Sequence, residues 1–262
     1  MRTVGLKLHL GRALYLIVLG PAGSGKTTLT AAFGSWLSEA QEARVAYVNL
    51  DPGADVLPYK PDVDARDYVT VEELMREKGL GPNGALVESM QVLYERRGEL
   101  LERISQLEAD VVLVDTPGQM ELFLFHDAGP AFSRELAKRG AAVALVLFDS
   151  SLARSPSHFA TLRLMSLVVQ LRLDVPTVAA LNKGDLEAAR RAAAWAKDPG
   201  PLLSDLEGEQ GVISELATKL VEVMNAYSVA ARIPLVSARE RWGFQELYDL
   251  LHEVWCACGD LT

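Results

Sequence analysis

Short runs of apolar residues alternate with longer segments of helical periodicity along most of the chain. The runs are apolar throughout and rich in β-branched residues, which favours strands covered on both faces, as parallel strands are in α/β proteins. We therefore predict an open, doubly wound, mostly parallel α/β sheet of about six or seven strands, with ligands bound at the carboxyl ends of the strands. The predicted strands are Leu14–Leu19, Val45–Asn49, Val111–Asp115, Val143–Asp149, Thr177–Leu181 and Ile233–Ser237.

Two segments show the spacing of amphipathic helices. A long helical pattern covers Leu86–Leu107, after a Gly-Pro-Asn-Gly turn at Gly81–Gly84. A second pattern, preceded by Asp198–Pro201, indicates a helical insertion at about residues 186–231 within a single domain that covers residues 1–262. Its apolar stripe either packs against the sheet or forms a groove for a protein client. The stripe comprises Ile213, Leu216, Leu220, Val223, Met224 and Tyr227.

The beginning of the chain resembles a secretory signal in its order of charges, because basic residues precede the apolar run Ala13–Leu19. That run leads directly into a motif that needs intact chain on both sides, so we interpret it as a buried strand. No stretch approaches the roughly 18 apolar residues of a membrane-spanning helix. We expect no membrane partner and a cytoplasmic location.

Composition excludes some classes of function. The chain has 262 residues, with 26 Lys and Arg against 35 Asp and Glu, so its formal net charge is −9. An acidic chain is poorly suited to binding a phosphate backbone, and we expect no direct nucleic-acid partner. The cysteines are Cys256 and Cys258, whose spacing lacks the further ligands of a structural zinc site, so we expect reduced thiols.

The strongest motif lies at Gly20–Thr27, which matches G-x-x-x-x-G-K-T/S between an apolar strand and a helical pattern. Its backbone N–H groups would bind phosphate oxygens, Lys26 would neutralise β/γ-phosphate charge, and the Thr27 hydroxyl would bind Mg²⁺. A glycine-rich turn capped by threonine is the alternative. The residues expected at the phosphates are Gly23, Ser24, Gly25, Lys26, Thr27 and Thr28.

A carboxylate, Asp115, ends the apolar run Val111–Asp115. At the carboxyl end of a strand it would hold Mg²⁺ on the side that faces Thr27. Gly118 would donate its N–H near the γ-phosphate, and Gln119 stands where a GTPase places a water-orienting amide. Without the phosphate loop, Asp115 would be read as a turn or helix cap.

The segment Asn182–Asp185 fits the pattern N-K-x-D. The Asp185 carboxylate can accept hydrogen bonds from guanine N1–H and the 2-amino group, a donor pair that adenine lacks. The Lys183 stem can lie along the purine face, and Asn182 can tie this loop to the phosphate loop. Ser237 and Ala238 resemble the turn whose backbone N–H contacts guanine O6 in GTPases. This motif is weak alone, and its position after the other motifs favours guanine.

Together these motifs resemble a GTPase, and Gly81-Pro82-Asn83 is similar to the tripeptide that names the GPN-loop GTPases. The segments Asn49–Gly53 and Asp115–Phe123 also resemble motifs of that family, and the resemblance covers essentially the whole chain. It implies a homodimer in which Asn83 of each subunit enters the active site of the other. Related dimeric ATPases carry a lysine after the first glycine of the loop, where this chain has Pro21. The alternative for Asn83 is the N-cap of a helix.

The resemblance also places Asp51 in the switch near Mg²⁺ and the attacking water. We expect Asp51 to position that water, with Gln119 and Glu121 assisting, although Glu121 could equally be a residue favoured at a helix start. The catalytic set is then Asp51, Asn83, Gln119, Glu121 and Lys26, and the metal set is Thr27, Asp51 and Asp115. We expect direct attack of water on the γ-phosphorus.

Three other functions stay open at this point. An ATPase of similar fold is disfavoured by the N-K-x-D segment. A nickel-insertion GTPase would need Cys and His clusters, which the chain lacks near its motifs. The third is a nucleotide-controlled assembly factor or scaffold that holds an unidentified protein client, with little hydrolysis of its own.

Overall fold

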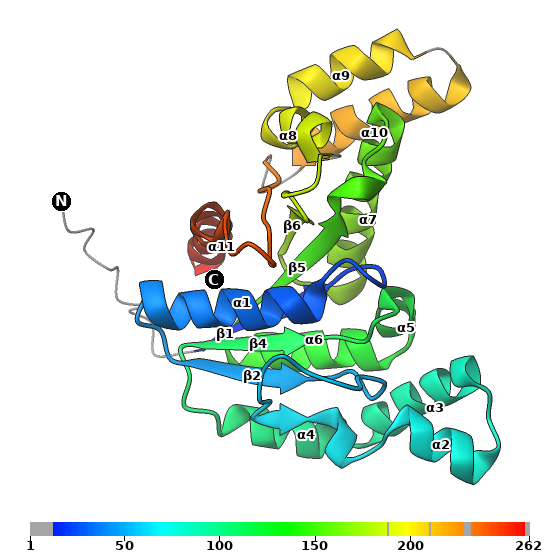
Figure 1. Ribbon diagram of the computed structural model, residues 1–262, viewed down its shortest axis with the longest axis vertical. Helices are drawn as coiled ribbons and strands as arrows, with labels where there is room; N and C mark the ends of the chain where they lie inside the picture. Colours follow the sequence, from blue (N-terminus) through cyan, green and yellow to red (C-terminus); the bar gives the residue numbers. More distant parts are fainter. Residues whose placement is uncertain (1–12, 188, 210, 228–231, 260–262) are drawn as a thin grey trace.

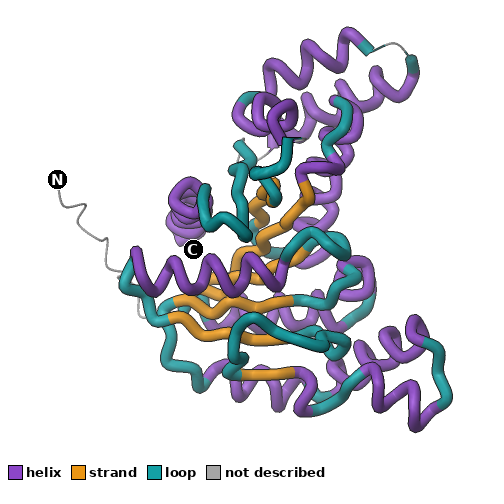
Figure 2. The backbone as a smooth tube through the Cα atoms, viewed as in Figure 1, coloured by secondary structure: helices purple, strands orange, loops and turns teal. Residues whose placement is uncertain are grey.

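The computed structural model describes residues 13–187, 189–209, 211–227 and 232–259. Within these residues six strands form one parallel sheet in the order β3-β2-β4-β1-β5-β6 (Figure 1). Helices lie on both faces of this sheet (Figure 2), so the predicted doubly wound α/β fold is confirmed. The strands are β1 (Leu14–Leu19), β2 (Val45–Asn49), β3 (Val63–Asp64), β4 (Val111–Asp115), β5 (Ala141–Asp149) and β6 (Thr177–Asn182).

Strand β1 organises the sheet because it lies between β4 and β5 and every one of its residues is buried. After β1 the chain moves toward β2, and after β4 it crosses to β5 on the other side. The carboxyl ends of β1 and β4 therefore meet where the strand order reverses, which is the usual ligand site of doubly wound sheets.

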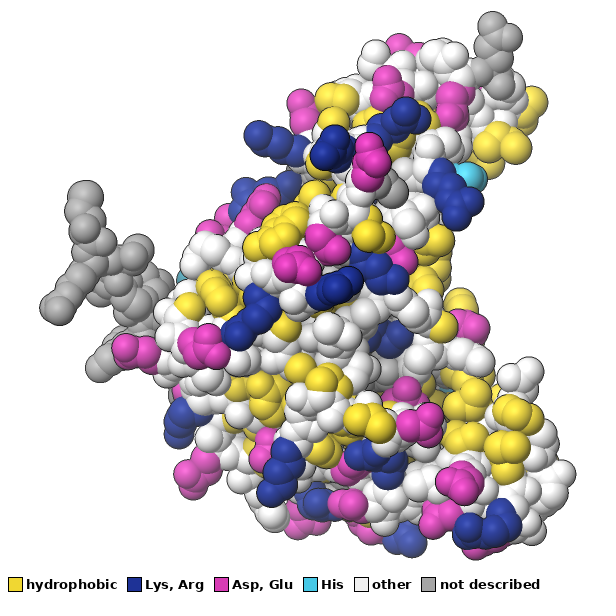
Figure 3. All heavy atoms as spheres, viewed as in Figure 1, with side chains coloured by type: hydrophobic (Ala, Val, Ile, Leu, Met, Phe, Trp, Pro, Cys, Tyr) yellow, Lys and Arg dark blue, Asp and Glu magenta, His cyan; other side chains and the backbone are white. Residues whose placement is uncertain are grey.

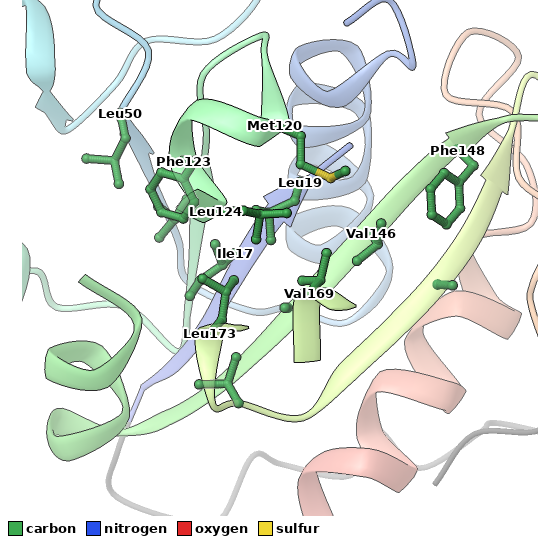
Figure 4. Packing of buried hydrophobic residues seen from close by; sticks show 14 of the residues in the cluster. Ile17, Leu19, Leu50, Met120, Phe123, Leu124, Val146, Phe148, Val169 and Leu173 are labelled. Carbon is green, nitrogen blue, oxygen red and sulfur yellow. The ribbon is translucent and has the colours of Figure 1, made fainter. Parts of the chain in front are cut away.

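Two apolar cores form, one on each face of the sheet. Alternate residues of β1 enter different cores: Ile17 and Leu19 face one, and Leu16 and Val18 face the other. The smaller core is covered by α1 (Lys26–Ala40) and α11 (Phe244–Gly259). In the larger core, Ile17 and Leu19 lie close to side chains from β5, α5 and α7 (Figure 4). Its helices include α4 (Arg97–Ser105), α5 (Met120–Phe125), α6 (Ala128–Arg139) and α7 (Pro156–Leu173).

Two small departures from the predicted strands occur. The predicted strand Ile233–Ser237 is wrong, because the described segment makes only isolated bridges, Leu181 with Leu235 and Ser237 with Trp242. Pro234 lacks an N–H and can only accept, from Leu181, so a regular ladder does not continue. Conversely, β3 was missed because a strand of two residues leaves no alternating pattern.

The helix predicted over Leu86–Leu107 is divided into α3 (Pro82–Glu95) and α4. The break falls at Arg96, whose ψ of 4° is not helical. Leu93 and Leu100, on either side of it, are both buried and keep the same periodicity. The hydrophobic pattern therefore cannot reveal this break.

Further helices lie beyond the two edges of the sheet (Figure 1). The hairpin of α2 (Val71–Lys78) and α3 lies near the β3 edge. Beyond β6 lie α8 (Ala189–Lys197), α9 (Pro199–Gly208) and α10 (Val212–Tyr227), and α10 packs on α7 and α9. That residues 186–231 are an insertion within a single domain stays a prediction. Short 3₁₀ turns, η1 (Ala65–Asp67) and η2 (Ser150–Leu152), complete the described elements.

Helix α10 buries only part of the predicted stripe. Its packed residues include Ala217, Val221 and Met224, whereas Ile213 and Leu216 are 75% and 58% exposed. Hydrophobic side chains gather near the turn between α9 and α10 on the molecular surface (Figure 3). Of the predicted stripe, Met224 is in the core and Leu220 is half-buried.

Among the described residues no helix is both long and apolar enough to cross a membrane. Cys256 and Cys258 belong to α11, but their side chains lie outside the described part of the chain. Their predicted state as reduced thiols stays a prediction.

Two helical glycines provide a test of the packing, because they differ in what a side chain would meet. A Cβ on buried Gly129 in α6 would lie 1.9 Å from the carbonyl oxygen of Phe123. A Cβ on exposed Gly98 in α4 would meet nothing within 4 Å. We expect Gly129→Ala to lower the free energy of unfolding by about 1–3 kcal/mol through overpacking. We expect Gly98→Ala to raise it by about 0.5–1 kcal/mol through helix propensity. Urea unfolding measures both, and equal effects of the two substitutions would contradict the described packing.

Candidate active site

The phosphate loop, residues 20–25, joins the carboxyl end of β1 to the N-terminus of α1. Gly20 and Gly25 have φ angles of 152° and 91°, in the region that favours glycine. A Cβ on Gly20 would lie 2.2 Å from the carbonyl oxygen of Leu147. A Cβ on Gly25 would lie 2.4 Å from Nδ2 of Asn182. The loop is therefore closely packed against neighbouring backbone and side chains, and it ends at a helix N-terminus, where anions are favoured.

Lys26 is the first residue of α1, and its side chain turns back over the loop. Its Nζ donates to three carbonyl oxygens, those of Gly20 at 2.9 Å, Pro21 at 3.2 Å and Gly118 at 3.2 Å. Burial lowers the pKa of Lys26, while the carboxylates of Asp115, Asp51 and Glu121 raise it. The ammonium therefore joins the phosphate loop to the segment after β4.

Asp115 ends β4 and is almost completely buried, at 1% exposure. Its Oδ2 accepts a hydrogen bond of 2.9 Å from the Tyr59 hydroxyl. Burial raises its pKa to about 6, although Thr27, Tyr59 and Lys26 act in the opposite direction. The other oxygen, Oδ1, is buried without a well-formed hydrogen bond. A buried carboxylate oxygen without a partner is suited to a cation, because such groups are otherwise costly.

Asp51 lies in the loop after β2, beside the segment that follows β4. Its Oδ2 accepts from the Gly118 N–H at 3.1 Å, and its Oδ1 accepts from the Gly53 N–H at 2.9 Å. Burial raises the pKa of Asp51, and these two bonds and the charge of Lys26 partly offset that effect. The structure therefore brings Asp51, Gly118 and Lys26 together, and the Gly118 N–H, which was expected to face the γ-phosphate, bonds Asp51 here.

A network that the sequence analysis missed braces this loop. The Asn49 side chain accepts from the Asp51 N–H at 3.0 Å and donates to Asp64 Oδ1 at 2.9 Å. Asp64 forms an ion pair of 2.7 Å with Arg66, whose guanidinium donates to the Ala54 carbonyl. The ion pair lowers the pKa of Asp64. Arg66 had no predicted role, because it belongs to the short turn η1 after β3 and no motif in the sequence marks it.

Asn182 connects the phosphate loop to the second predicted binding segment. Its Nδ2 donates to the Ser24 carbonyl at 2.9 Å, and its Oδ1 accepts from the Ala238 N–H at 3.0 Å. Asn182 is buried at 2% exposure. One amide therefore satisfies groups on two loops, and the predicted connection to the phosphate loop is observed.

Asp185 and Lys183 lie on the same turn with different partners. Asp185 is exposed and its Oδ1 accepts from the Ser237 hydroxyl at 2.6 Å, which lowers its pKa. Lys183 has a φ of 60° and forms an ion pair of 2.7 Å with Asp149 at the end of β5. The predicted set Asn182, Lys183, Asp185, Ser237 and Ala238 thus lies together at the carboxyl ends of β5 and β6.

Asn83 is not part of this cluster. It is exposed in the first turn of α3, the second helix of the α2–α3 hairpin. The alternative that Asn83 is an N-cap is wrong, because the cap is Gly81 and Pro82 is the first helical residue. A proline at that position starts a helix without needing a side-chain cap.

The remaining predicted residues have simpler environments. Gln119 occupies the N-cap position of α5 without a side-chain capping bond, and Glu121 is exposed in the first turn of that helix. Ser24 is buried with an unpartnered Oγ. Gly23 and Thr28 are exposed along the phosphate loop and the start of α1, and Thr27 is half-buried.

Comparisons with known proteins agree with this arrangement. Residues 18–257 match a family described as conserved hypothetical ATP binding protein. The chain is 41% identical to GPN-loop GTPase PAB0955 of Pyrococcus abyssi, over 95% of this chain and 100% of that protein. It is 30% identical to GPN-loop GTPase 1 of Dictyostelium discoideum, over 89% of this chain but 59% of that longer relative. The crystal structure of PAB0955, a GTPase in apo form, superposes on this chain with a TM-score of 0.86 and 40% identity. The match covers 94% of this chain and 98% of the PAB0955 chain. The chain therefore belongs to the GPN-loop GTPase family.

Proposed function

We propose that this protein binds GTP with Mg²⁺ and hydrolyses it to GDP and phosphate. The observation that carries the proposal is the double hydrogen bond of Asn182, to the Ser24 carbonyl and from the Ala238 N–H. It fixes the phosphate loop and the N-K-x-D segment as one unit. A nucleotide whose phosphates lie in the loop would then have its base at Asp185.

The base pocket favours guanine over adenine. The Asp185 carboxylate accepts hydrogen bonds, and guanine presents two adjacent donors, N1–H and the 2-amino group. Adenine offers no such pair, so the carboxylate would face an acceptor. The Ser237 hydroxyl holds Oδ1 of Asp185 at 2.6 Å, which limits rotation of the carboxylate. Asp185 therefore favours GTP, although the matching family is described as ATP binding.

The residues at the ends of β1 and β4 suit a divalent cation. Asp115 offers Oδ1, which has no well-formed hydrogen bond, and the nearby Thr27 hydroxyl lowers the pKa of this carboxyl by weak hydrogen bonding. Mg²⁺ bound beside a nucleotide needs only one or two protein ligands, since phosphates and waters supply the rest. The absence of any cluster of three or more His, Cys, Asp and Glu among the described residues is compatible with that requirement. When bound, Mg²⁺ would neutralise charge between the β- and γ-phosphates.

Hydrolysis requires positioning and charge neutralisation more than covalent chemistry. Water attacks the γ-phosphorus in line as the bond to the β-phosphate oxygen breaks. Lys26 and the backbone N–H groups of the loop would stabilise the developing charge on the phosphate oxygens. Asp51, with an assisting role for Gln119 and Glu121, would orient the water. The raised pKa of Asp51 results from burial and makes its carboxylate a better proton acceptor.

We also propose that the enzyme acts as a homodimer in which Asn83 enters the partner's active site. Within one chain, Asn83 is exposed in the first turn of α3, and the Lys26 ammonium bonds Gly20, Pro21 and Gly118. An exposed amide at a helix start is accessible to a second subunit. Pro21 occupies the loop position at which related ATPases carry a lysine, so an amide from Asn83 would take the stabilising role.

A client-holding role stays a second prediction. The supporting observation is that Val212, Ile213, Leu216 and Val223 of α10 are each more than half exposed. Such side chains can belong to an interaction surface. The absence of nucleic-acid partners and the cytoplasmic location likewise stay predictions.

Base selection can be tested with Asp185→Asn. The amide would place a donor opposite the guanine donors, so we expect GTP affinity to fall by about 100-fold or more. Xanthosine triphosphate, which carries a carbonyl at position 2, would gain affinity relative to GTP. The control is Glu187→Gln, which neutralises another exposed carboxylate nearby. Competition against labelled GTP measures these affinities, and displacement of GTP by excess ATP from the wild-type protein would overturn the guanine assignment.

The intersubunit role of Asn83 can be tested by mixing two inactive variants. Lys26→Ala destroys the phosphate site but keeps the hairpin, whereas Asn83→Ala keeps the site and loses the amide. Random mixing produces about half of the dimers with one subunit of each variant. Each mixed dimer has one complete site out of two, so about a quarter of all sites are complete. GTP turnover per subunit should therefore recover to about a quarter of the wild-type rate. GTP turnover measures this recovery. No recovery on mixing, or full activity of Asn83→Ala alone, would exclude the proposed exchange.

The free energy of unfolding should depend on the protonation state of Asp115. Its folded-state pKa of about 6 exceeds the ordinary 3.8, so the folded protein binds this proton more tightly than the unfolded chain does. The stabilisation that comes from binding this proton is therefore fully present below about pH 4 and is lost as pH rises through about 6. Without Mg²⁺ or nucleotide, we expect Asp115→Asn to be more stable than the wild type by up to about 3 kcal/mol at about pH 7.5. The two should converge near pH 4. Urea unfolding in a chelator tests this, and a difference that does not change with pH would contradict it.

A further inference from the structure

Tyr59 connects the loop between β2 and β3 to the metal carboxylate expected at the end of β4. Its hydroxyl donates to Asp115 Oδ2 at 2.9 Å, although the two residues are 56 positions apart in the chain. The tyrosine hydroxyl is the donor in this bond, because an ionised carboxylate can only accept. No motif in the sequence singled out this residue.

The position of the Tyr59 ring is fixed by packing. It stacks on Tyr47 of β2, with ring centroids 5.0 Å apart and planes inclined by 19°. The Tyr47 backbone N–H in turn donates to Asp62 at 2.8 Å, farther along the same loop. Room for Tyr47 depends on Gly34 in α1, where a Cβ would lie 2.4 Å from the Tyr47 hydroxyl oxygen. The donor is therefore held by contacts that do not involve Asp115.

A fixed donor on one carboxylate oxygen determines which oxygen stays available. With Oδ2 bound to Tyr59, the buried Oδ1 is the oxygen of Asp115 without a well-formed hydrogen bond. Rotation of the carboxylate would break the Tyr59 bond, which, as a bond to a charged group, is stronger than an average hydrogen bond.

We propose that Tyr59 is a positioning residue for Mg²⁺: its hydroxyl holds Asp115 so that Oδ1 is presented to the cation. The inference rests on the proposed function and deepens it. It assigns the loop at residues 50–62 a part in metal affinity, in addition to the part of Asp51 in orienting water.

The test is Tyr59→Phe, which removes the hydroxyl and keeps the stacked ring. The readout is Mg²⁺ titration of the protein with fluorescent methylanthraniloyl-GDP, independent of turnover. We expect the Mg²⁺ concentration for half-saturation to rise about tenfold, the value of one hydrogen bond to a charged group. Affinity for the same nucleotide in a chelator should be unchanged. An unchanged or lower Mg²⁺ requirement would overturn the proposal.

Tyr47→Phe is the matched control, since it removes a hydroxyl from the other ring of the same stack. It should leave the Mg²⁺ titration as in the wild type, and thermal unfolding confirms that both phenylalanine variants fold. In an Asp115→Asn background, Tyr59→Phe should add little to the loss of Mg²⁺ affinity. If the effects of the two substitutions on Mg²⁺ affinity add fully, Tyr59 does not act through Asp115, and the proposal is wrong. Failure of the wild type to bind the GDP probe in a Mg²⁺-dependent manner would overturn the proposed function as well as this inference.

Discussion

The active-site end of the molecule depends on the side-chain amide of Asn182. It bonds the Ser24 carbonyl with its NH₂ group and the Ala238 N–H with its oxygen, and it lies where any side chain on Gly25 would collide with it. Three segments far apart in sequence thereby share one buried polar group. Loss of the amide would leave a buried carbonyl and a buried N–H without partners, which is more costly than losing one exposed bond.

Much of the fold was predictable because both faces of the sheet are covered. A strand such as β1 supplies apolar residues to two cores, so it appears in the sequence as an unbroken apolar run. Features with no such burial signature were missed. Strand β3 is too short to show alternation, the break at Arg96 falls between residues that keep one periodicity, and Pro234 limits a predicted strand to bridges.

The candidate site also contains residues that the sequence reveals and residues that it does not. The residues proposed to bind the nucleotide, such as Lys26 and Asp185, were found because phosphate and base binding require a fixed spacing in the sequence. Residues that hold neighbouring groups, as Tyr59 holds Asp115 and Arg66 holds the Ala54 carbonyl, act through tertiary contacts with no fixed spacing. The role of Asn83 is a third case, since its proposed partner belongs to another copy of the chain and no contact within one chain can identify it.

The stacked tyrosines extend the steric constraints of the candidate site into the middle of α1. Gly34 lies in the middle of α1, where replacing glycine by alanine normally favours the helix. Here the added methyl would press on Tyr47, and through the stack on Tyr59 and the carboxylate of Asp115. A helix position outside the phosphate loop is therefore sterically restricted to glycine by Tyr47, and a larger residue at Gly34 would require the aromatic pair to move.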